Sequence, residues 1–202
     1  TLSSSPKDLV LASANAGKIK ELQELLGGLG IKIIPQTDLS IPDIEETGLS
    51  FVENAILKAR NAAKLSNLPA VADDSGLEVD YLKGAPGIYS ARFAGEGATD
   101  DTNKNKLLEL MTDVPVDQRS ARYQTVIVYM RHGDDPTPII CQGTWEGTIA
   151  TESRGDQGFG YDPIFVPDGD SRTFGEMEMA EKKTFNHRAR AFARLVGAAD
   201  FH

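Results

Sequence analysis

The stretch LPAVADDSG, residues 68–76, decides how the rest of the chain is interpreted. A short apolar run ends on two adjacent carboxylates, Asp73 and Asp74, and Ser75 and Gly76 follow at once. Carboxylates at the carboxyl end of a buried strand are costly to bury unless they are paired or hold a metal. Ligands of open α/β sheets bind at that edge, and Mg²⁺ takes one or two carboxylates plus phosphates. Because Asp, Ser and Gly also form turns, this segment alone leaves a site and a plain turn both open.

Strand and helix patterns alternate around this stretch. Residues 9–12 and 31–34 are short apolar runs typical of buried strands, and residues 18–26 between them carry apolar side chains at helical spacing. The other expected elements are strands over 70–73, 120–131 and 139–149, helices over 51–65 and 101–111, and one or two helices over 177–196. The first strand-helix-strand unit indicates parallel pairing, whereas the last two long strands indicate an antiparallel hairpin. We therefore expect an α/β fold with a mixed sheet.

Length and composition favour a single domain of ordinary globular type. The chain has 202 residues, which predicts one domain over 1–202, with residues 1–8 as a flexible N-terminus. The net charge of −9 argues against a general nucleic-acid or membrane-surface binder. Cys141 is the single cysteine, so an internal disulfide is excluded and a reducing cytoplasm is favoured. The sequence has no apolar run of membrane-spanning length, and its first residues lack the apolar core of a signal peptide.

A candidate phosphate-binding turn lies between the first expected strand and helix. Residues 13–18 read SANAGK, which places Gly17 and Lys18 at a helix start. A helix N-terminus offers free backbone N–H groups and a positive dipole end, so it favours phosphate. The segment does not match the Walker pattern. A helix start capped by Asn15 or Ser13 is therefore the alternative interpretation.

Two further polar groups precede the carboxylate pair. Asn54 and Lys58 are four residues apart, so they share a face of the expected helix. Glu45 and Glu46, in the loop before that helix, could add a carboxylate to a metal held by the aspartate pair. A solvated helix face and ordinary loop polarity are the alternatives.

The later part of the chain carries a candidate site for a nucleobase. Residues 158–163 read GFGYDP, and flanking glycines free the backbone to expose an aromatic ring that can stack on a base. Asp162 could then hydrogen-bond a base edge. Lys182 and Asn186 share a face if their segment is helical. An aromatic turn that packs on the core and a solvated basic helix face remain the alternatives.

The order and spacing of these segments resemble the inosine/xanthosine triphosphate pyrophosphatases, the Ham1-like family, in their bacterial branch. The resemblance runs from about residue 9 to residue 196. One departure is Asn186, where the family usually has Ser before His-Arg. The motifs that carry the resemblance are SANAGK at 13–18, ENA at 53–55, ADDSG at 72–76, PGIYSAR at 86–92, FGYDP at 159–163 and HR at 187–188.

This resemblance implies a fold and an activity. The implied fold is an elongated mixed β-sheet with flanking helices, in two lobes around a central cleft. The implied reaction is hydrolysis of ITP, dITP and XTP to the monophosphate and pyrophosphate, which cleanses the nucleotide pool. Mg²⁺ is the implied cofactor, and the implied protein is a cytoplasmic homodimer without nucleic-acid or membrane partners. One alternative is a Maf-like pyrophosphatase of other base preference, but this sequence lacks the arginine-rich first loop of those enzymes. The other alternative is a nucleotide-binding regulator without turnover.

The resemblance also assigns roles to individual residues. It makes Glu46 and Asp74 the metal carboxylates and Asp74 the proton acceptor for the attacking water. If the strand continues through both aspartates, only one can face the metal, because neighbours on an extended strand point to opposite faces. Asp73 is then expected either to hydrogen-bond neighbouring backbone or to support the metal ligands. The implied substrate-binding residues are Ser13, Ala14, Asn15, Ala16, Gly17, Lys18 and Lys58 for the triphosphate, Ser75 for the substrate, and Phe159, Gly160, Tyr161, Asp162, Lys182, His187 and Arg188 for the base.

Selectivity should follow from hydrogen-bond matching at the base. Hypoxanthine and xanthine carry a 6-oxo acceptor and an N1–H donor, so Lys182 or Arg188 can donate to the oxygen while Asp162 accepts from a donor on the base or ribose. Adenine reverses this pattern and would leave buried groups unpaired, at about 1–3 kcal/mol each. Guanine shares the 6-oxo edge, and the sequence does not show how its 2-amino group is rejected.

Overall fold

The computed structural model describes residues 7–13, 15–28, 30–183, 190–191 and 194–195. The chain forms two compact units. Unit 1 consists of Thr1–Asp74, Val126–Gln142 and Ala191–His202, and unit 2 consists of Ser75–Thr125 and Gly143–Arg190. No helix among the described residues has the length and apolar character needed to cross a membrane.

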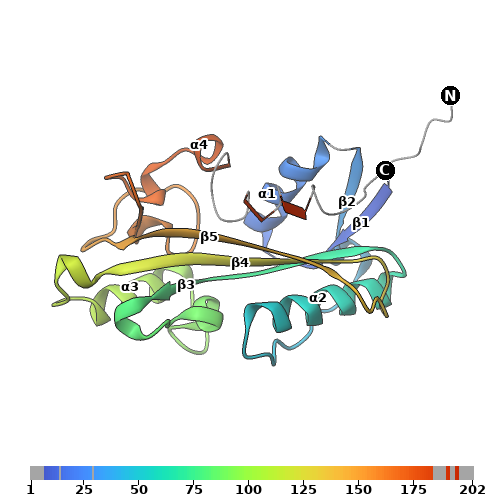
Figure 1. Cartoon of the computed structure of the whole chain (residues 1–202), viewed down its shortest axis with the longest axis horizontal. Helices are drawn as coiled ribbons and strands as arrows, with labels where there is room; N and C mark the ends of the chain where they lie inside the picture. Colours follow the sequence, from blue (N-terminus) through green and yellow to red (C-terminus); the bar gives the residue numbers. More distant parts are fainter. Residues whose placement is uncertain (1–6, 14, 29, 184–189, 192–193, 196–202) are drawn as a thin grey trace. The chain divides into compact units, whose positions relative to one another are not determined.

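Among the described residues, six strands form one sheet in the order β2-β1-β3-β4-β5-β6 (Figure 1). β1 pairs parallel with β2 and β3, whereas β5 and β6 pair antiparallel. The mixed sheet with flanking helices predicted from the sequence is therefore confirmed. The strands are β1 (Lys7–Leu11), β2 (Ile31–Pro35), β3 (Ala70–Val79), β4 (Ser120–Met130), β5 (Ile139–Ile149) and β6 (Phe165–Pro167).

In the part of the chain that the structure describes, four α-helices and six short 3₁₀ helices accompany the strands. The α-helices are α1 (Ala16–Gly27), α2 (Phe51–Ser66), α3 (Asp100–Leu110) and α4 (Met179–Lys183), among the described residues. The 3₁₀ helices are η1 (Gln36–Leu39), η2 (Asp80–Leu82), η3 (Gly87–Arg92), η4 (Val116–Gln118), η5 (Asp162–Ile164) and η6 (Phe174–Glu176). The first three predicted helices are confirmed within two residues at each end. Of the one or two helices predicted over 177–196, the structure shows α4 and helical residues at 190–191 and 194–195, whereas residues 184–189, 192–193 and 196 lie outside the described residues.

Side-chain alternation along the strands of unit 1 builds two apolar layers. Leu9, Leu11 and Val71 pack with the apolar face of α1. Val10 and Ala72 pack with a row of alanines on α2. Figure 1 shows α1 and α2 on opposite sides of the strands. Because successive strand residues point to opposite faces, each helix of unit 1 meets a different set of strand side chains.

The carboxylate pair does not end its strand. The sequence predicted a strand over 70–73, but β3 continues through Asp73 and Asp74 to Val79. The prediction that the pair ends a strand and its alternative as a plain turn are both wrong. The strand continues because Leu77 and Val79 are fully buried in the core of unit 2, which outweighs the turn preference of Asp, Ser and Gly. The strand that ends nearby is β1, whose last residue lies beside Val71.

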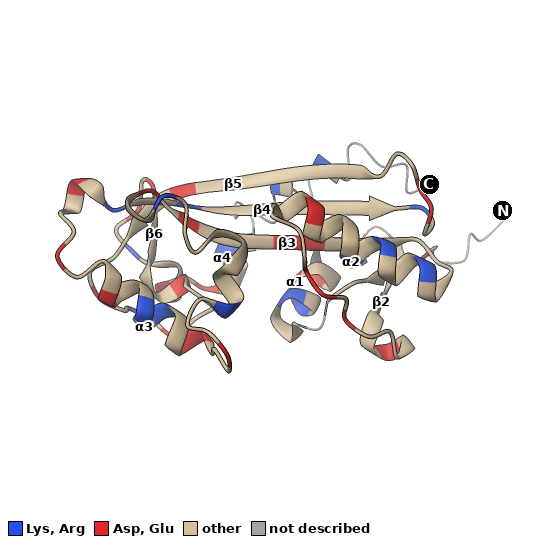
Figure 2. Ribbon diagram, turned by 90° about the horizontal axis from the view of Figure 1, so that it is seen from below, with Lys and Arg blue, Asp and Glu red and all other residues tan. Residues whose placement is uncertain are grey.

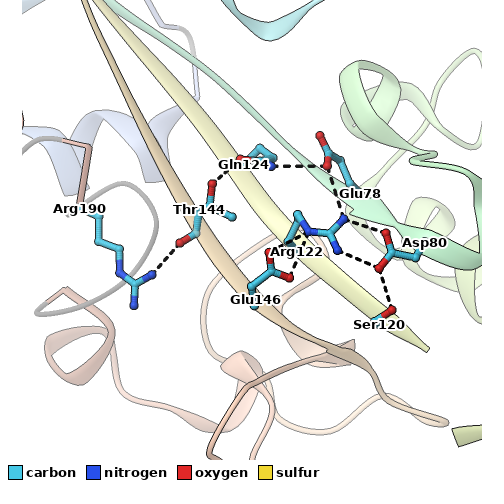
Figure 3. Close-up of polar contacts among 8 residues, drawn as sticks. All are labelled: Glu78, Asp80, Ser120, Arg122, Gln124, Thr144, Glu146 and Arg190. Atoms are coloured by element: carbon cyan, nitrogen blue, oxygen red, sulfur yellow. Dashed lines mark hydrogen bonds and ion pairs between the residues drawn. The ribbon is translucent and has the colours of Figure 1, made fainter. Parts of the chain in front are cut away.

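Unit 2 packs its core on one face of β3, β4 and β5 and carries a polar network on the other. Its core contains Tyr123, Trp145, Phe165 and Phe174. The polar network centres on Arg122, whose guanidinium contacts the carboxylates of Asp80, Glu146 and Glu78 (Figure 3). Arg122 therefore links three neighbouring strand segments on the face opposite the core.

The N-terminal prediction needs one adjustment. β1 includes Lys7 and Asp8, which the sequence assigned to the flexible segment 1–8. Residues 1–6 lie outside the described residues.

Candidate functional site

Lys58 on α2 gathers the predicted metal carboxylates of unit 1. Its Nζ lies 3.0 Å from Glu46 Oε1 and 3.6 Å from Asp74 Oδ1. The same ammonium donates a hydrogen bond of 2.6 Å to the backbone carbonyl of Asp73. The contact between α2, its preceding loop and β3 therefore brings together three residues that the sequence predicted as site residues.

The two aspartates face different helices, as alternation along β3 requires. Ala70, Ala72 and Asp74 share the face on which α2 packs, so Asp74 meets Lys58. Asp73 points to the other face, where its Oδ2 lies 3.2 Å from the Nζ of Lys18 on α1. Asp73 is 1% exposed, so its negative charge is buried against that lysine. Asp73 is thus paired with a lysine that was predicted to bind phosphate, which agrees with a supporting role.

Burial and the neighbouring charges perturb both ionisable groups at the centre of the cluster. Burial raises the pKa of Asp74 from 3.8 to about 6; Glu46 and Asp73 add to this effect, and Lys58 and Lys18 oppose it. Burial lowers the pKa of Lys58, but the carboxylates of Asp73, Asp74 and Glu46 outweigh burial and raise it above its ordinary value. Lys58 therefore stays charged, while Asp74 is poised to take up a proton near neutral pH.

The carboxylates fit a magnesium ion. Asp74 Oδ2 is buried and accepts no hydrogen bond from any residue that the structure describes. A buried carboxylate oxygen of this kind is a ready ligand for a hard cation. Within the described ranges, no three His, Cys, Asp or Glu side chains are placed to hold a metal by themselves. Mg²⁺ usually takes one or two carboxylates and completes its shell with water and phosphate, so Asp74 and Glu46 would be the protein ligands of such an ion.

The start of α1 lies in the same unit and has the features of an anion site. Asn15 caps the helix, because its side chain accepts a hydrogen bond from the Lys18 N–H, and Ser13 Oγ accepts one from the Asn15 N–H. The first turn contains no acidic residue. Its N–H groups and dipole therefore favour an anion, and Lys18 adds a charge. Ala14 lies outside the described residues. Figure 2 shows the basic residues of α1 and the acidic ones along β3.

Unit 2 holds the residues predicted to bind the base. Tyr161 is buried in the core, and its hydroxyl donates to the Ser90 carbonyl at 2.7 Å. Its ring therefore packs on the core, as the alternative interpretation of this turn expected. Phe159 is half-buried, and Gly160 has a positive φ of 63°. The structure pairs Lys182 Nζ with Asp162 Oδ2 at 3.4 Å.

The other predicted residues are distributed as follows. Ser75 is half-buried on β3 directly after Asp74, and is the first residue of unit 2. His187, Arg188 and the unusual Asn186 lie outside the described residues, so their predicted roles stay predictions.

Two contacts in these sites were not predicted. The pair of Lys18 with Asp73 joins residues from different elements, and only the alternation of β3 signalled that Asp73 needs a partner of its own. The hydroxyl of Tyr123 donates to Asp162 Oδ1 at 3.0 Å. The alternation of the strand places Tyr123 on its inward face, and a buried tyrosine hydroxyl usually has a hydrogen-bond partner. The sequence therefore contained a signal that Tyr123 has a partner.

Unit 1 thus defines an α/β protein with a buried cluster of carboxylates and lysines beside a helix N-terminus, suited to phosphate groups and a divalent cation. A model of the Ham1 family matches residues 9–198. A dITP/XTP pyrophosphatase from Shigella flexneri is 56% identical over 190 residues, which cover 94% of this chain and 96% of the relative. A dITP/XTP pyrophosphatase from Vibrio cholerae is 54% identical over 194 residues, which cover 96% of this chain and 97% of the relative.

A solved structure agrees with these relatives. A HAM1 protein from Coxiella burnetii superposes with a TM-score of 0.88 at 51% identity, over 95% of this chain and 98% of that one. The chain belongs to the Ham1 family. The resemblance found in the sequence is therefore confirmed.

Proposed function

We propose that this protein hydrolyses non-canonical purine nucleoside triphosphates, namely ITP, dITP and XTP, to the monophosphate and pyrophosphate. The observation that carries the proposal is Asp74: a buried carboxylate with a raised pKa, one unbonded oxygen, and Lys58 and Glu46 at its side. The names of relatives at more than half identity support the same reaction.

Asp74 is suited to act as the general base. A pKa of about 6 leaves the carboxylate ionised at neutral pH and close enough to the working pH to take a proton from water. In the proposed step, the water oxygen forms a bond to the α-phosphorus, at the anhydride between the α- and β-phosphates, and Asp74 takes the water proton. The bridging bond breaks, and pyrophosphate leaves.

Lys18, Lys58 and the first turn of α1 stabilise the phosphate oxygens. Both lysines are partly buried, so their charges act in a medium that screens them less than water does. Mg²⁺ held by Glu46 and Asp74 would supply further neutralisation of phosphate charge. Asp73 fixes Lys18 and, through its carbonyl, Lys58, so both positive charges are in place before the nucleotide arrives.

The base is assigned to unit 2. Lys182 is 7% exposed, and an ammonium there can donate to the 6-oxo group of hypoxanthine or xanthine. Phe159 supplies a ring for stacking. The wider proposal, from the family resemblance, is a cytoplasmic homodimer that uses Mg²⁺ and cleanses the nucleotide pool.

A substrate panel tests the proposal. ITP, dITP, XTP, GTP, ATP and dTTP are each incubated with the protein and Mg²⁺, and released pyrophosphate is measured separately from orthophosphate. We expect pyrophosphate from ITP, dITP and XTP, with much slower reaction of the other three. Release of orthophosphate, or a preference for ATP, would overturn the proposed reaction, and binding of ITP without turnover would identify a regulator instead.

A further inference from the structure

Unit 2 contains a cavity that the proposed reaction does not use. Its volume is about 260 Å³, and it lies beside the end of β5, with Thr148 and Thr151 in its lining. Arg119 and Arg154 line it as well, and Glu152 is the acidic residue of the lining. Pockets for drug-sized ligands usually exceed about 300 Å³, so this cavity suits a smaller ligand.

Arg119 forms a buried part of the wall, and backbone carbonyls hold it in place. It is 3% exposed. Its Nε donates to the Ile149 carbonyl at 2.7 Å, and its Nη2 donates to the Ala150 carbonyl at 2.9 Å. Its Nη1 donates to the carbonyls of Met111 at 2.6 Å and Val114 at 3.1 Å, at the end of α3. Burial lowers the pKa of Arg119, and no carboxylate among the described residues pairs with it, so carbonyl dipoles alone offset its charge.

One N–H of Arg119 remains on the cavity side. A guanidinium has five N–H groups, and the four carbonyls that Arg119 contacts take four of them. The fifth belongs to Nη2. Ala150, the partner of Nη2, lines the cavity, whereas Met111 and Val114, the partners of Nη1, do not. The Nη2 end of this rigidly held guanidinium therefore faces the cavity.

Arg154 brings a second donor that lacks an acceptor. Its Nε is buried and makes no hydrogen bond to any residue that the structure describes; Glu176 Oε1 lies 3.6 Å away. Its Nη2 donates to the Ser171 carbonyl at 3.3 Å. A buried N–H without an acceptor is costly, so an oxygen atom placed against this Nε would be favourable.

These donors favour an anion with several oxygens. Glu176 offsets part of the charge of Arg154, so Arg119 supplies the uncompensated positive charge. Glu152 is exposed, so solvent screens its repulsion. Guanidinium groups match the oxygens of phosphate, and the threonine hydroxyls of the lining can donate to further oxygens. A phosphate group has oxygens on all sides and can meet both arginines at once.

We propose that this cavity is a binding site for a small phosphate anion, orthophosphate or pyrophosphate, held between Arg119 and Arg154. The site belongs to unit 2, whereas the start of α1, which the proposed function assigns to the triphosphate, belongs to unit 1. The proposal goes beyond the proposed function and does not depend on it.

Nuclear magnetic resonance tests the proposal residue by residue. Orthophosphate and pyrophosphate are titrated separately into the protein at constant ionic strength without Mg²⁺, and the backbone amide signals are followed together with the Nε–H signal of Arg154. We expect the signals of residues 150–154 to shift together and to saturate with one dissociation constant, distinct from that of residues 15–18. The anion with the lower constant at residues 150–154 is the preferred ligand of the cavity.

Arg154→Gln removes the charge and the Nε–H. The dissociation constant at residues 150–154 should rise about tenfold or more, because a charge-assisted hydrogen bond is lost, and the constant at residues 15–18 should not change. Arg172→Gln is the matched control, because the side chain of Arg172 is 43% exposed against 40% for Arg154, it belongs to the same unit and it does not line the cavity. It should leave both constants unchanged.

Thr151→Val is a milder variant that leaves the contact of Arg154 with Glu176 intact, and it should raise the constant at residues 150–154 about threefold. Saturable shifts confined to residues 15–18, or shifts at residues 150–154 that grow linearly without saturation, would overturn the proposal. So would a wild-type constant in folded Arg154→Gln or, if the amide spectrum shows that this variant does not fold, a wild-type constant in Thr151→Val. A wild type that releases no pyrophosphate from ITP refutes the proposed function and leaves this titration unaffected.

Discussion

Asp73 and Asp74 are adjacent residues with different tasks. Asp73 is buried against Lys18, and Asp74 lies beside Lys58 and Glu46. Asp74 Oδ2 is buried and accepts no hydrogen bond from the described residues. The folded protein therefore carries a carboxylate charge there with little solvation. Such a residue should reduce stability in exchange for activity.

Asp74→Asn should therefore stabilise the protein while it strongly slows turnover. The folded-state pKa of Asp74 is raised from 3.8 to about 6, so the folded protein binds the proton more tightly and loses stability as pH rises through this window. At pH 7 without Mg²⁺ we expect Asp74→Asn to raise the free energy of unfolding by up to about 3 kcal/mol, and at pH 3.5 by almost nothing. Pyrophosphate release should fall by roughly 10²–10⁴-fold.

Urea unfolding at the two pH values and a pyrophosphate assay measure both effects. Asp117→Asn, at an exposed carboxylate of unit 2, is the control and should change neither. Near-normal turnover of folded Asp74→Asn would rule out Asp74 as the base, and equal stabilities at pH 7 would rule out the raised pKa.

At the scale of elements, the loop before α2 is tied to that helix by a buried amide. Asn54 is 1% exposed; its Oδ1 accepts the Gly48 N–H at 2.7 Å, and its Nδ2 donates to the Gly48 carbonyl at 3.4 Å. Glu53 adds a second tie, because its carboxylate accepts the Leu49 N–H at 3.0 Å. These contacts fix the loop two residues after Glu46, so Asn54 positions a predicted metal ligand without contacting the metal.

Asn54→Ala should loosen this loop and weaken the use of Mg²⁺. We expect the Mg²⁺ concentration for half-maximal pyrophosphate release to rise several-fold, with a smaller change of kcat at saturating Mg²⁺. The free energy of unfolding should fall by about 1 kcal/mol, because the half-buried N–H and carbonyl of Gly48 lose their hydrogen-bond partner. Asn61→Ala is the matched control: its amide contacts the same loop at the Pro42 carbonyl, 3.0 Å away, in an exposed position. An unchanged Mg²⁺ requirement in Asn54→Ala would contradict the positioning role.

The sequence predicted long regular elements well and short or tertiary ones poorly. The strand over 139–149 is predicted with its observed bounds, since its pattern is long and bounded by turn residues. β3 was cut short because Asp, Ser and Gly have low strand propensity, and burial between neighbouring strands overrides propensity. The three residues of β6 are too few for a periodic signal.

Local patterns reached only part of the candidate site. The cap of α1 involves neighbouring residues only, so the pattern of a helix start was enough to propose Asn15 or Ser13 as the cap, and the structure shows Asn15. The contacts of Lys58 with Asp74 and of Tyr123 with Asp162 join distant segments. Residue spacing along the chain carries no information on such contacts, because packing of whole elements creates them.

At the scale of the whole molecule, the chain combines an overall charge of −9 with local positive groups. Lys18 and Lys58 belong to unit 1, and Lys182 belongs to unit 2. The phosphates are common to all nucleoside triphosphates, whereas the base differs between them. If Lys18 acts on the common phosphates and Lys182 on the variable base, substitutions of these two lysines should differ in how their effects depend on the base.

Lys18→Ala should lower kcat/KM by the same factor for ITP, XTP and GTP, roughly 10–10³-fold, because it removes a charge from phosphate oxygens. Lys182→Ala should instead change the ratio of kcat/KM for ITP to that for ATP, lowering it about tenfold. An ammonium donates to a 6-oxo group and opposes the 6-amino group of adenine, so its loss harms ITP and relieves ATP. Lys20→Ala, at an exposed lysine of α1, serves as the control.

Initial rates of pyrophosphate release on these nucleotides decide between the two patterns. A loss in Lys18→Ala that depends on the base would mean that Lys18 contributes to selectivity, and a uniform loss in Lys182→Ala would remove that lysine from base recognition. Either result would contradict the separate roles proposed for these two lysines. The predicted pattern would support it, because only a residue that senses the base can change a ratio between substrates with identical phosphates.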